Sequence, residues 1–175
     1  DPMCGTGTLL AEAAAVALGL PPGRLRESWA FTRFPGFEPR RFAAIRAEPI
    51  PCPGPDLALH GNDRDPEAIR AAAANLARAG LRERTHLSTG DAFAFTPPPG
   101  PGLVLVNPPY GERLAEEPTQ WRRLGDLLKQ RFRGWKAAVL AGDAGLGKHL
   151  GLRPRRRLPV RNGPLPIRIL LLDLY

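Results

Sequence analysis

Asn107, Pro108, Pro109 and Tyr110 are consecutive residues whose types and order could do chemistry together. The two prolines remove two backbone N–H donors, so the main chain there can only accept hydrogen bonds, and the Asn107 amide offers a further oxygen. Tyr110 adds a flat ring on which a planar base could stack. An exocyclic –NH2 group on a heterocycle fits such a site, because two acceptors can hold its two hydrogens. The alternative is a rigid turn, since Asn-Pro and Pro-Pro dipeptides mark loops.

A glycine-rich turn, Asp1-Pro2-Met3-Cys4-Gly5-Thr6-Gly7-Thr8, precedes an apolar helical run over residues 9–18. Glycines at such a turn let a ligand approach the backbone and the positive helix N-terminus closely. The spacing is not a dinucleotide fingerprint, because Leu10 stands where a small residue is needed, and no Gly-Lys-Ser/Thr of a phosphate loop follows. A tight turn that only starts a helix is the alternative.

Two carboxylates come directly after predicted strands. Asp63 follows the strand over residues 57–61, where nucleotide sites of α/β proteins hold a ribose diol. Asp91 follows the strand over 85–88 and is a natural acceptor for an adenine amine. Each has a plain alternative, a solvated loop carboxylate for Asp63 and a turn former for Asp91.

The elements that must position these residues alternate along the chain. We expect helices over 9–18, 40–47, 66–79, 119–132 and 146–150, and strands over 57–61, 85–88, 103–106, 136–141 and 167–175. This order predicts one α/β domain with a Rossmann-like, doubly wound, mostly parallel sheet, and Asn162-Gly163 predicts an antiparallel C-terminal hairpin. In such sheets ligands bind at the carboxyl ends of the strands. The glycine turn should itself follow a central strand, so we expect a first strand upstream of Asp1.

Residues 21–55 read as an insertion with little periodicity. The segment is rich in aromatic residues and ends in a stiff proline-rich connector, residues 49–55. We expect its aromatic side chains to pack on the edge of the sheet.

The charge of the chain favours a polyanionic partner. Its 175 residues include 25 Lys and Arg against 17 Asp and Glu, which gives a net charge of +8 and a pI near 10.7. Arginine predominates, and its planar fork suits phosphate. The arginines that gather near the C-terminus are candidate phosphate contacts, with a solvated turn as the alternative: Arg153, Arg155, Arg156, Arg157 and Arg161.

Other classes of protein find little support in the sequence. No apolar run reaches the length of a membrane span, and no signal peptide is apparent. Cys4 and Cys52 do not make a disulfide framework, and the three histidines are too scattered to predict a metal site. We therefore expect a cytoplasmic protein.

The combination of the glycine turn, Asp63 and Asp91 resembles the class I S-adenosylmethionine-dependent methyltransferases. The tetrapeptide at 107–110 is similar to the signature of those that methylate nitrogen in amines and amides. More narrowly, residues 1–8, 107–114, 132–135 and 160–165 resemble the THUMP-containing guanine-N2 methyltransferases of 23S, large-subunit ribosomal RNA. The resemblance covers nearly the whole chain.

This resemblance implies transfer of a methyl group from S-adenosyl-L-methionine to the exocyclic N2 of a guanine in ribosomal RNA, the expected partner. It makes 107–110 catalytic and the C-terminal arginines RNA-binding, and it implies cofactor contacts from Asp1, Cys4, Gly5, Gly7, Asp63, Asp91 and Ala92. Residues 1–175 would be a catalytic domain that lacks its N-terminal part, with an RNA-binding domain upstream. Since related enzymes share the tetrapeptide, tRNA guanine, DNA adenine N6 and protein glutamine stay open as acceptors, as does an inactive RNA-binding remnant.

Overall fold

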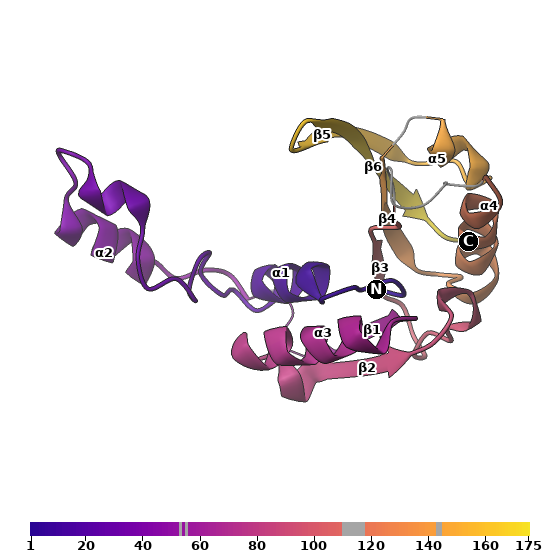
Figure 1. Cartoon of the computed structure of the whole chain (residues 1–175), viewed down its shortest axis with the longest axis horizontal. Helices are drawn as coiled ribbons and strands as arrows, with labels where there is room; N and C mark the ends of the chain where they lie inside the picture. The colour runs from indigo at the N-terminus through magenta and orange to yellow at the C-terminus, as the bar shows by residue number, and fades with distance from the viewer. Residues whose placement is uncertain (53, 55, 110–117, 143–144) are drawn as a thin grey trace.

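The computed structural model describes residues 1–52, 54, 56–109, 118–142 and 145–175, and its strands form two sheets (Figure 1). One sheet is a parallel pair, and the other has the order β3-β4-β6-β5 with β3 parallel and β6 antiparallel to β4. The strands are β1 (Leu59–Asp63), β2 (Thr85–Thr89), β3 (Leu103–Val106), β4 (Lys136–Ala141), β5 (Arg156–Asn162) and β6 (Leu165–Asp173). The predicted α/β class is confirmed, with two parallel pairs and an antiparallel hairpin.

The segment over residues 1–4 lies between the two sheets. The Asn62 backbone N–H donates to the Asp1 carbonyl at 2.9 Å, and the Cys4 N–H donates to the Asn62 carbonyl at 2.8 Å. Met3 packs against the hydrophobic cluster of β3 and β4, whereas Cys4 belongs to the cluster around β1. The predicted single sheet is therefore divided, because no described strand pairs with both β1 and β3. The strand expected upstream of Asp1 stays a prediction.

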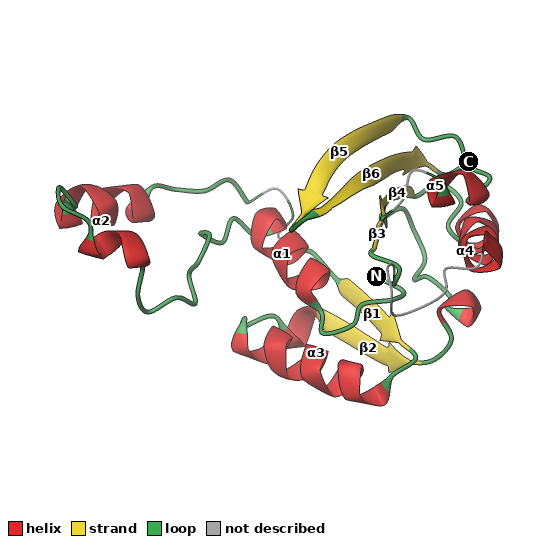
Figure 2. Ribbon diagram, turned by 45° about the horizontal axis from the view of Figure 1, so that its top comes forward, coloured by secondary structure: helices red, strands yellow, loops and turns green. Residues whose placement is uncertain are grey.

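Helices cover the sheets as their sequence patterns predict (Figure 2). The long ones are α1 (Thr8–Ala17), α3 (Pro66–Arg78) and α4 (Pro118–Arg131), and α5 (Leu146–His149) is short. The Asp65 side chain caps α3 by accepting from the Glu67 N–H at 2.9 Å, with Pro66 in the first turn. Short 3-10 helices occupy Arg82–Arg84 and Ala92–Ala94.

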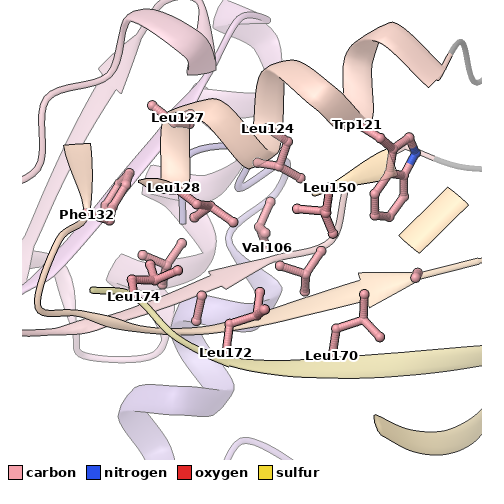
Figure 3. Packing of buried hydrophobic residues seen from close by; sticks show 14 residues of the cluster. Val106, Trp121, Leu124, Leu127, Leu128, Phe132, Leu150, Leu170, Leu172 and Leu174 are labelled. Carbon is pink, nitrogen blue, oxygen red and sulfur yellow. The ribbon is translucent and has the colours of Figure 1, made fainter. Parts of the chain in front are cut away.

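A hydrophobic cluster beneath α4 holds β3 in place (Figure 3). Trp121, Leu124, Leu128 and Phe132 recur at helical spacing and are at most 2% exposed, so they form one buried stripe. Each such side chain contributes roughly 1.5–3 kcal/mol on burial. The carboxyl end of β3 is thereby fixed by the core rather than by its loop.

The insertion, described over residues 21–52, projects away from both sheets as an arm that carries a 3-10 helix (Ala30–Arg33) and α2 (Pro39–Ala47) (Figures 1 and 2). Its rings contact one another, with centroid distances of 5.1 Å for Phe31 and Phe42 and 5.4 Å for Trp29 and Phe31. The expectation that these rings pack on the sheet edge is wrong, because they find apolar partners within the arm itself.

The predicted antiparallel C-terminal hairpin is confirmed, and its two strands are β5 and β6. Arg156 and Arg157 belong to β5, which pairs with β6 along its whole length. A charged run can be a strand here because β5 is the edge of the sheet and its side chains reach solvent.

No helix that the structure describes is long and apolar enough to span a bilayer.

Candidate active site

A cavity of about 1010 Å³ lies at the carboxyl ends of β1, β2 and β3. Residues of the glycine turn, the two strand-end aspartates and the tetrapeptide meet on its wall, although together they span more than 100 positions of the chain: Gly5, Asp63, Asp91, Ala92, Asn107, Pro108 and Pro109. This is where an open α/β sheet binds its ligands.

Asp63 ends β1 with its carboxylate held by two backbone donors. One oxygen accepts from the Gly5 N–H at 2.9 Å and the other accepts from the Asp65 N–H at 3.0 Å. Gly5 has a φ of 51° with nothing within 4 Å of the position of an added Cβ, so the turn presents bare backbone. The carboxylate is therefore oriented before any ligand arrives, with lone pairs left for a diol.

Asn62 is a positioning residue that the sequence reasoning missed. It is 3% exposed, and its side-chain amide donates to the carbonyls of Pro2 at 3.2 Å and Gly90 at 3.0 Å. Its amide oxygen accepts from the Ser88 hydroxyl at 2.9 Å. One buried side chain thus ties the glycine turn to the end of β2. An asparagine just before the motif aspartate, inside an apolar strand, was the available signal.

Asp91 is engaged on both of its oxygens. It accepts from the Phe93 N–H at 3.0 Å, and it pairs with the Arg123 guanidinium of α4 at 3.2 Å. The same guanidinium lies 3.9 Å from the centroid of the Phe93 ring. Arg123 and Phe93 both line the cavity, and no sequence pattern links them.

The Asn107 side chain is exposed at the end of β3, and no hydrogen bond to it is found within the described residues. Pro108 beside it is buried and Pro109 is exposed, so the backbone here is anchored at one residue. An amide oxygen and adjacent carbonyls with no donors nearby can accept from an amine. Tyr110, the fourth residue of the predicted catalytic set, lies outside the described residues.

Three residues predicted to contact the cofactor are not among the described residues that line the cavity. Gly7 packs against α3, since an added Cβ would lie 3.2 Å from the Ala72 Cβ. Burial, and then the nearby Asp63 charge, raise the pKa of the Cys4 thiol to about 11, which keeps it a neutral packing group. The Asp1 side chain accepts from the Met3 N–H at 3.0 Å and shapes the turn. Their direct contact with a cofactor remains a prediction.

The predicted RNA-binding arginines lie on the hairpin and the segment before it, all of them exposed. Arg155 pairs with Asp173 at 3.9 Å. Arg161 lines a second cavity, of about 680 Å³, between the end of β4 and the hairpin.

The family of the chain is identified by comparison with known proteins. Residues 1–170 match the model of the RMKL-like methyltransferase domain. Over 98% of its length the chain is 38% identical to the ribosomal RNA large subunit methyltransferase K/L of Pseudomonas putida, of which it spans 25%. The chain therefore belongs to the RMKL-like methyltransferase domain family, and the prediction of a methyltransferase is confirmed at that level.

Two solved structures share the arrangement of the whole chain. One, a candidate methyltransferase in complex with SAH, is 24% identical with a TM-score of 0.82, and the chain covers 47% of it. The other, described as a candidate N6-adenine-specific DNA methylase of Listeria monocytogenes, is 25% identical with a TM-score of 0.74, with 46% covered. The first establishes a common fold, and in both cases the chain spans about half of the solved protein.

Proposed function

We propose that this chain transfers a methyl group from S-adenosyl-L-methionine to the exocyclic N2 of a guanine in large-subunit ribosomal RNA. The observation that carries the proposal is the single cavity on which Gly5, Asp63, Asp91 and Asn107 meet. It combines acceptors suited to a nucleoside with acceptors suited to an amine. The family match and the name of the Pseudomonas relative support the same reaction.

The cofactor fits the first half of the cavity. At about 1010 Å³ the cavity has the size of a small-molecule site. Asp63 would accept from the ribose hydroxyls, Asp91 from the adenine amine, and the bare backbone at Gly5 admits the rest of the ligand. When bound, S-adenosyl-L-methionine supplies a methyl group on a cationic sulfonium.

The second half of the cavity orients the methyl acceptor. The lone pair of guanine N2 is delocalised into the ring, which makes the amine a poor nucleophile. The Asn107 oxygen and the Pro108 carbonyl would each accept one N–H, which holds the amine in line and favours a pyramidal nitrogen. The chain needs no strong base before methyl transfer, because the nitrogen becomes acidic only as it gains positive charge.

The substrate is a base that must leave the RNA stack to enter the cavity. Tyr110 stacking on it would contribute roughly 1–3 kcal/mol, and the C-terminal arginines would contact phosphates. An upstream RNA-binding domain and a cytoplasmic location are parts of the same proposal. Among the alternatives, DNA adenine N6 has a specific observation in its favour, the description of the Listeria relative.

Methylation by the full-length enzyme tests the proposal. Defined fragments of large-subunit ribosomal RNA, tRNA and adenine-containing duplex DNA are incubated with radiolabelled cofactor, and the modified nucleosides are identified by mass spectrometry. We expect N2-methylguanosine from the ribosomal RNA alone. N6-methyladenine from the DNA would replace the proposal with its alternative, and an absence of transfer to any substrate would overturn it.

A further inference from the structure

The β5–β6 hairpin carries three arginines on one face. In the antiparallel register Arg157, Pro159 and Arg161 lie opposite Leu170, Arg168 and Pro166. Arg168 is thus the diagonal neighbour of both Arg157 and Arg161, at a separation of about 7–8 Å. Guanidinium groups at that spacing can converge on one anion, because each side chain is long and flexible.

The same face continues the surface that α4 and α5 cover further along the sheet. Leu170 on β6 and Val139 on β4 are paired and belong to the buried cluster under α4. One step along, Arg168 pairs with Ala141, and beyond the helices the face opens into the cavity of about 680 Å³. The hairpin runs past the end of β4 (Figure 1). Its residues make one wall of that cavity.

The lining of this hairpin cavity is apolar apart from its two arginines. Pro159, Val160, Pro166 and Ile167 surround Arg161 and Arg168, with Ala141 and Gly142 at the end of β4. Neither Arg161 nor Arg168 forms a salt bridge with any carboxylate in the described part of the chain, whereas Arg155 is paired with Asp173. Unpaired guanidinium groups over an apolar floor suit a nucleotide, whose phosphate takes the charge and whose sugar or base covers the floor.

The position of the hairpin cavity relates it to the candidate active site. Val106 at the end of β3 pairs with Val139 on β4, which in turn pairs with Leu170 on β6, two residues from Arg168. Two strand spacings, about 10 Å, therefore separate the end of β3 from the part of β6 that leads to Arg168. That distance is short enough for one RNA strand to reach both cavities.

We propose that the hairpin cavity is a subsite for a nucleotide that flanks the methylated base, with Arg161 and Arg168 as the clamp on its phosphate. The inference rests on the proposed function for the identity of the substrate. It adds Arg168, which no sequence motif pointed to, and it separates Arg161 from the rest of the arginine run.

The test is a comparison of two double variants of the full-length enzyme. One is Arg161→Gln with Arg168→Gln, and the matched control is Arg33→Gln with Arg40→Gln, which removes the same charge from exposed positions on the arm, outside the cavity. Binding to a single-stranded ribosomal RNA fragment is measured as a function of salt. Loss of the clamp should weaken binding roughly tenfold to a hundredfold and lower the salt slope by about 0.7, the value for one phosphate. The control should change binding by less than threefold.

The contacted phosphate can be located by replacing the phosphates of the fragment, one at a time, with neutral methylphosphonates. One replacement near the target guanine should weaken binding to the wild type and to the control but not to the clamp variant. Equal losses in both double variants, or a clamp variant that responds to every replacement as the wild type does, would overturn the subsite. These binding measurements do not depend on methyl transfer, so failure of the proposed reaction is seen separately in the product analysis.

Discussion

The two halves of the main cavity differ in how completely their polar groups are occupied. On the β1–β2 side, the Asp63 carboxylate accepts two backbone N–H groups and Asp91 is held by a backbone N–H and by Arg123. On the β3 side, the Asn107 side chain is exposed and no hydrogen bond to it is found in the described chain. One half is set by internal contacts, and the other presents open acceptors.

This difference suggests how the work is divided. A carboxylate fixed in advance can bind a cofactor without reorganisation, and preorganised groups give more binding per contact. An exposed amide oxygen beside a buried proline can instead accept hydrogen bonds from the substrate, and those hydrogen bonds can assist the reaction. The two halves belong to different sheets, so a substitution in one half need not alter the geometry of the other.

Of the substitutions that separate the two halves of the cavity, the largest effect, on kcat, is expected at Asn107. Asn107→Ala should lower kcat by roughly 10²–10³, as does removal of one preorganised hydrogen-bonding group in other enzymes. Asn107→Asp keeps an acceptor of the same size and places a negative charge near a cationic sulfonium, so it should retain more activity than the alanine variant. Single-turnover rates at saturating RNA rank the three proteins, and an alanine variant as fast as wild type would reduce the tetrapeptide to a turn.

The matching prediction on the other half concerns Asp63. Hydrogen bonds to a charged group contribute about 1.5–3 kcal/mol, so Asp63→Ala should weaken cofactor binding by roughly tenfold to a hundredfold. Calorimetry on the full-length enzyme measures this affinity, with thermal unfolding as the control for the lost contacts to Gly5 and Asp65. Unchanged affinity would remove Asp63 from the cofactor site.

Asn62 links the glycine turn to β2, so its loss should affect stability first. Asn62→Ala leaves the carbonyls of Pro2 and Gly90 without their side-chain donor, and each buried unsatisfied group costs roughly 1–3 kcal/mol. Asn75→Ala is the matched control, because its amide donates to the Thr6 carbonyl at an exposed site. Chemical denaturation should show a clearly lower unfolding free energy for the first variant than for the second. Equal values would contradict the role assigned to Asn62.

The smallest effect is expected at Arg123, which would compete with the proposed adenine for the Asp91 carboxylate and the face of the Phe93 ring. The ion pair is about half exposed, with side-chain exposures of 48% and 57%, so it contributes at most about 1 kcal/mol. Arg123→Gln should therefore tighten cofactor binding by roughly two- to fivefold. Arg122→Gln removes the same charge from an exposed neighbour and should have no such effect. Weaker binding in Arg123→Gln would mean that the guanidinium itself contacts the ligand.

Much of the fold was predictable because local signals and burial agree. Asp65, Pro66 and Gly80 bound α3, and the apolar run Leu103–Val106 is a strand over that same range. The two parallel strand pairs place their carboxyl ends together, so residues read one by one from strand ends do meet in one cavity. The division into two sheets leaves β1 and β3 without a common partner among the described strands, which is the position that the strand predicted before the glycine turn would take.

The contacts that sequence could not predict are those between side chains far apart in the chain. Arg123 reaches Asp91 across 32 positions, and the diagonal of Arg161 and Arg168 depends on the strand register of a hairpin. The aromatic residues of the arm have the composition of a core, but composition does not specify which partner they pack on. Such features depend on tertiary geometry rather than on periodicity or turn chemistry.

The two halves of the cavity are expected to act independently, the one in cofactor binding and the other in substrate orientation. Cofactor binding by the Asn107→Ala variant tests this independence most directly. Titration calorimetry with S-adenosyl-L-methionine, on a full-length protein already found slow in single turnover, isolates the cofactor half from the substrate half. We expect a dissociation constant within about twofold of wild type, since the groups assigned to the cofactor come from β1, β2 and the glycine turn. A loss of cofactor affinity in parallel with the loss of rate would contradict the division of the cavity.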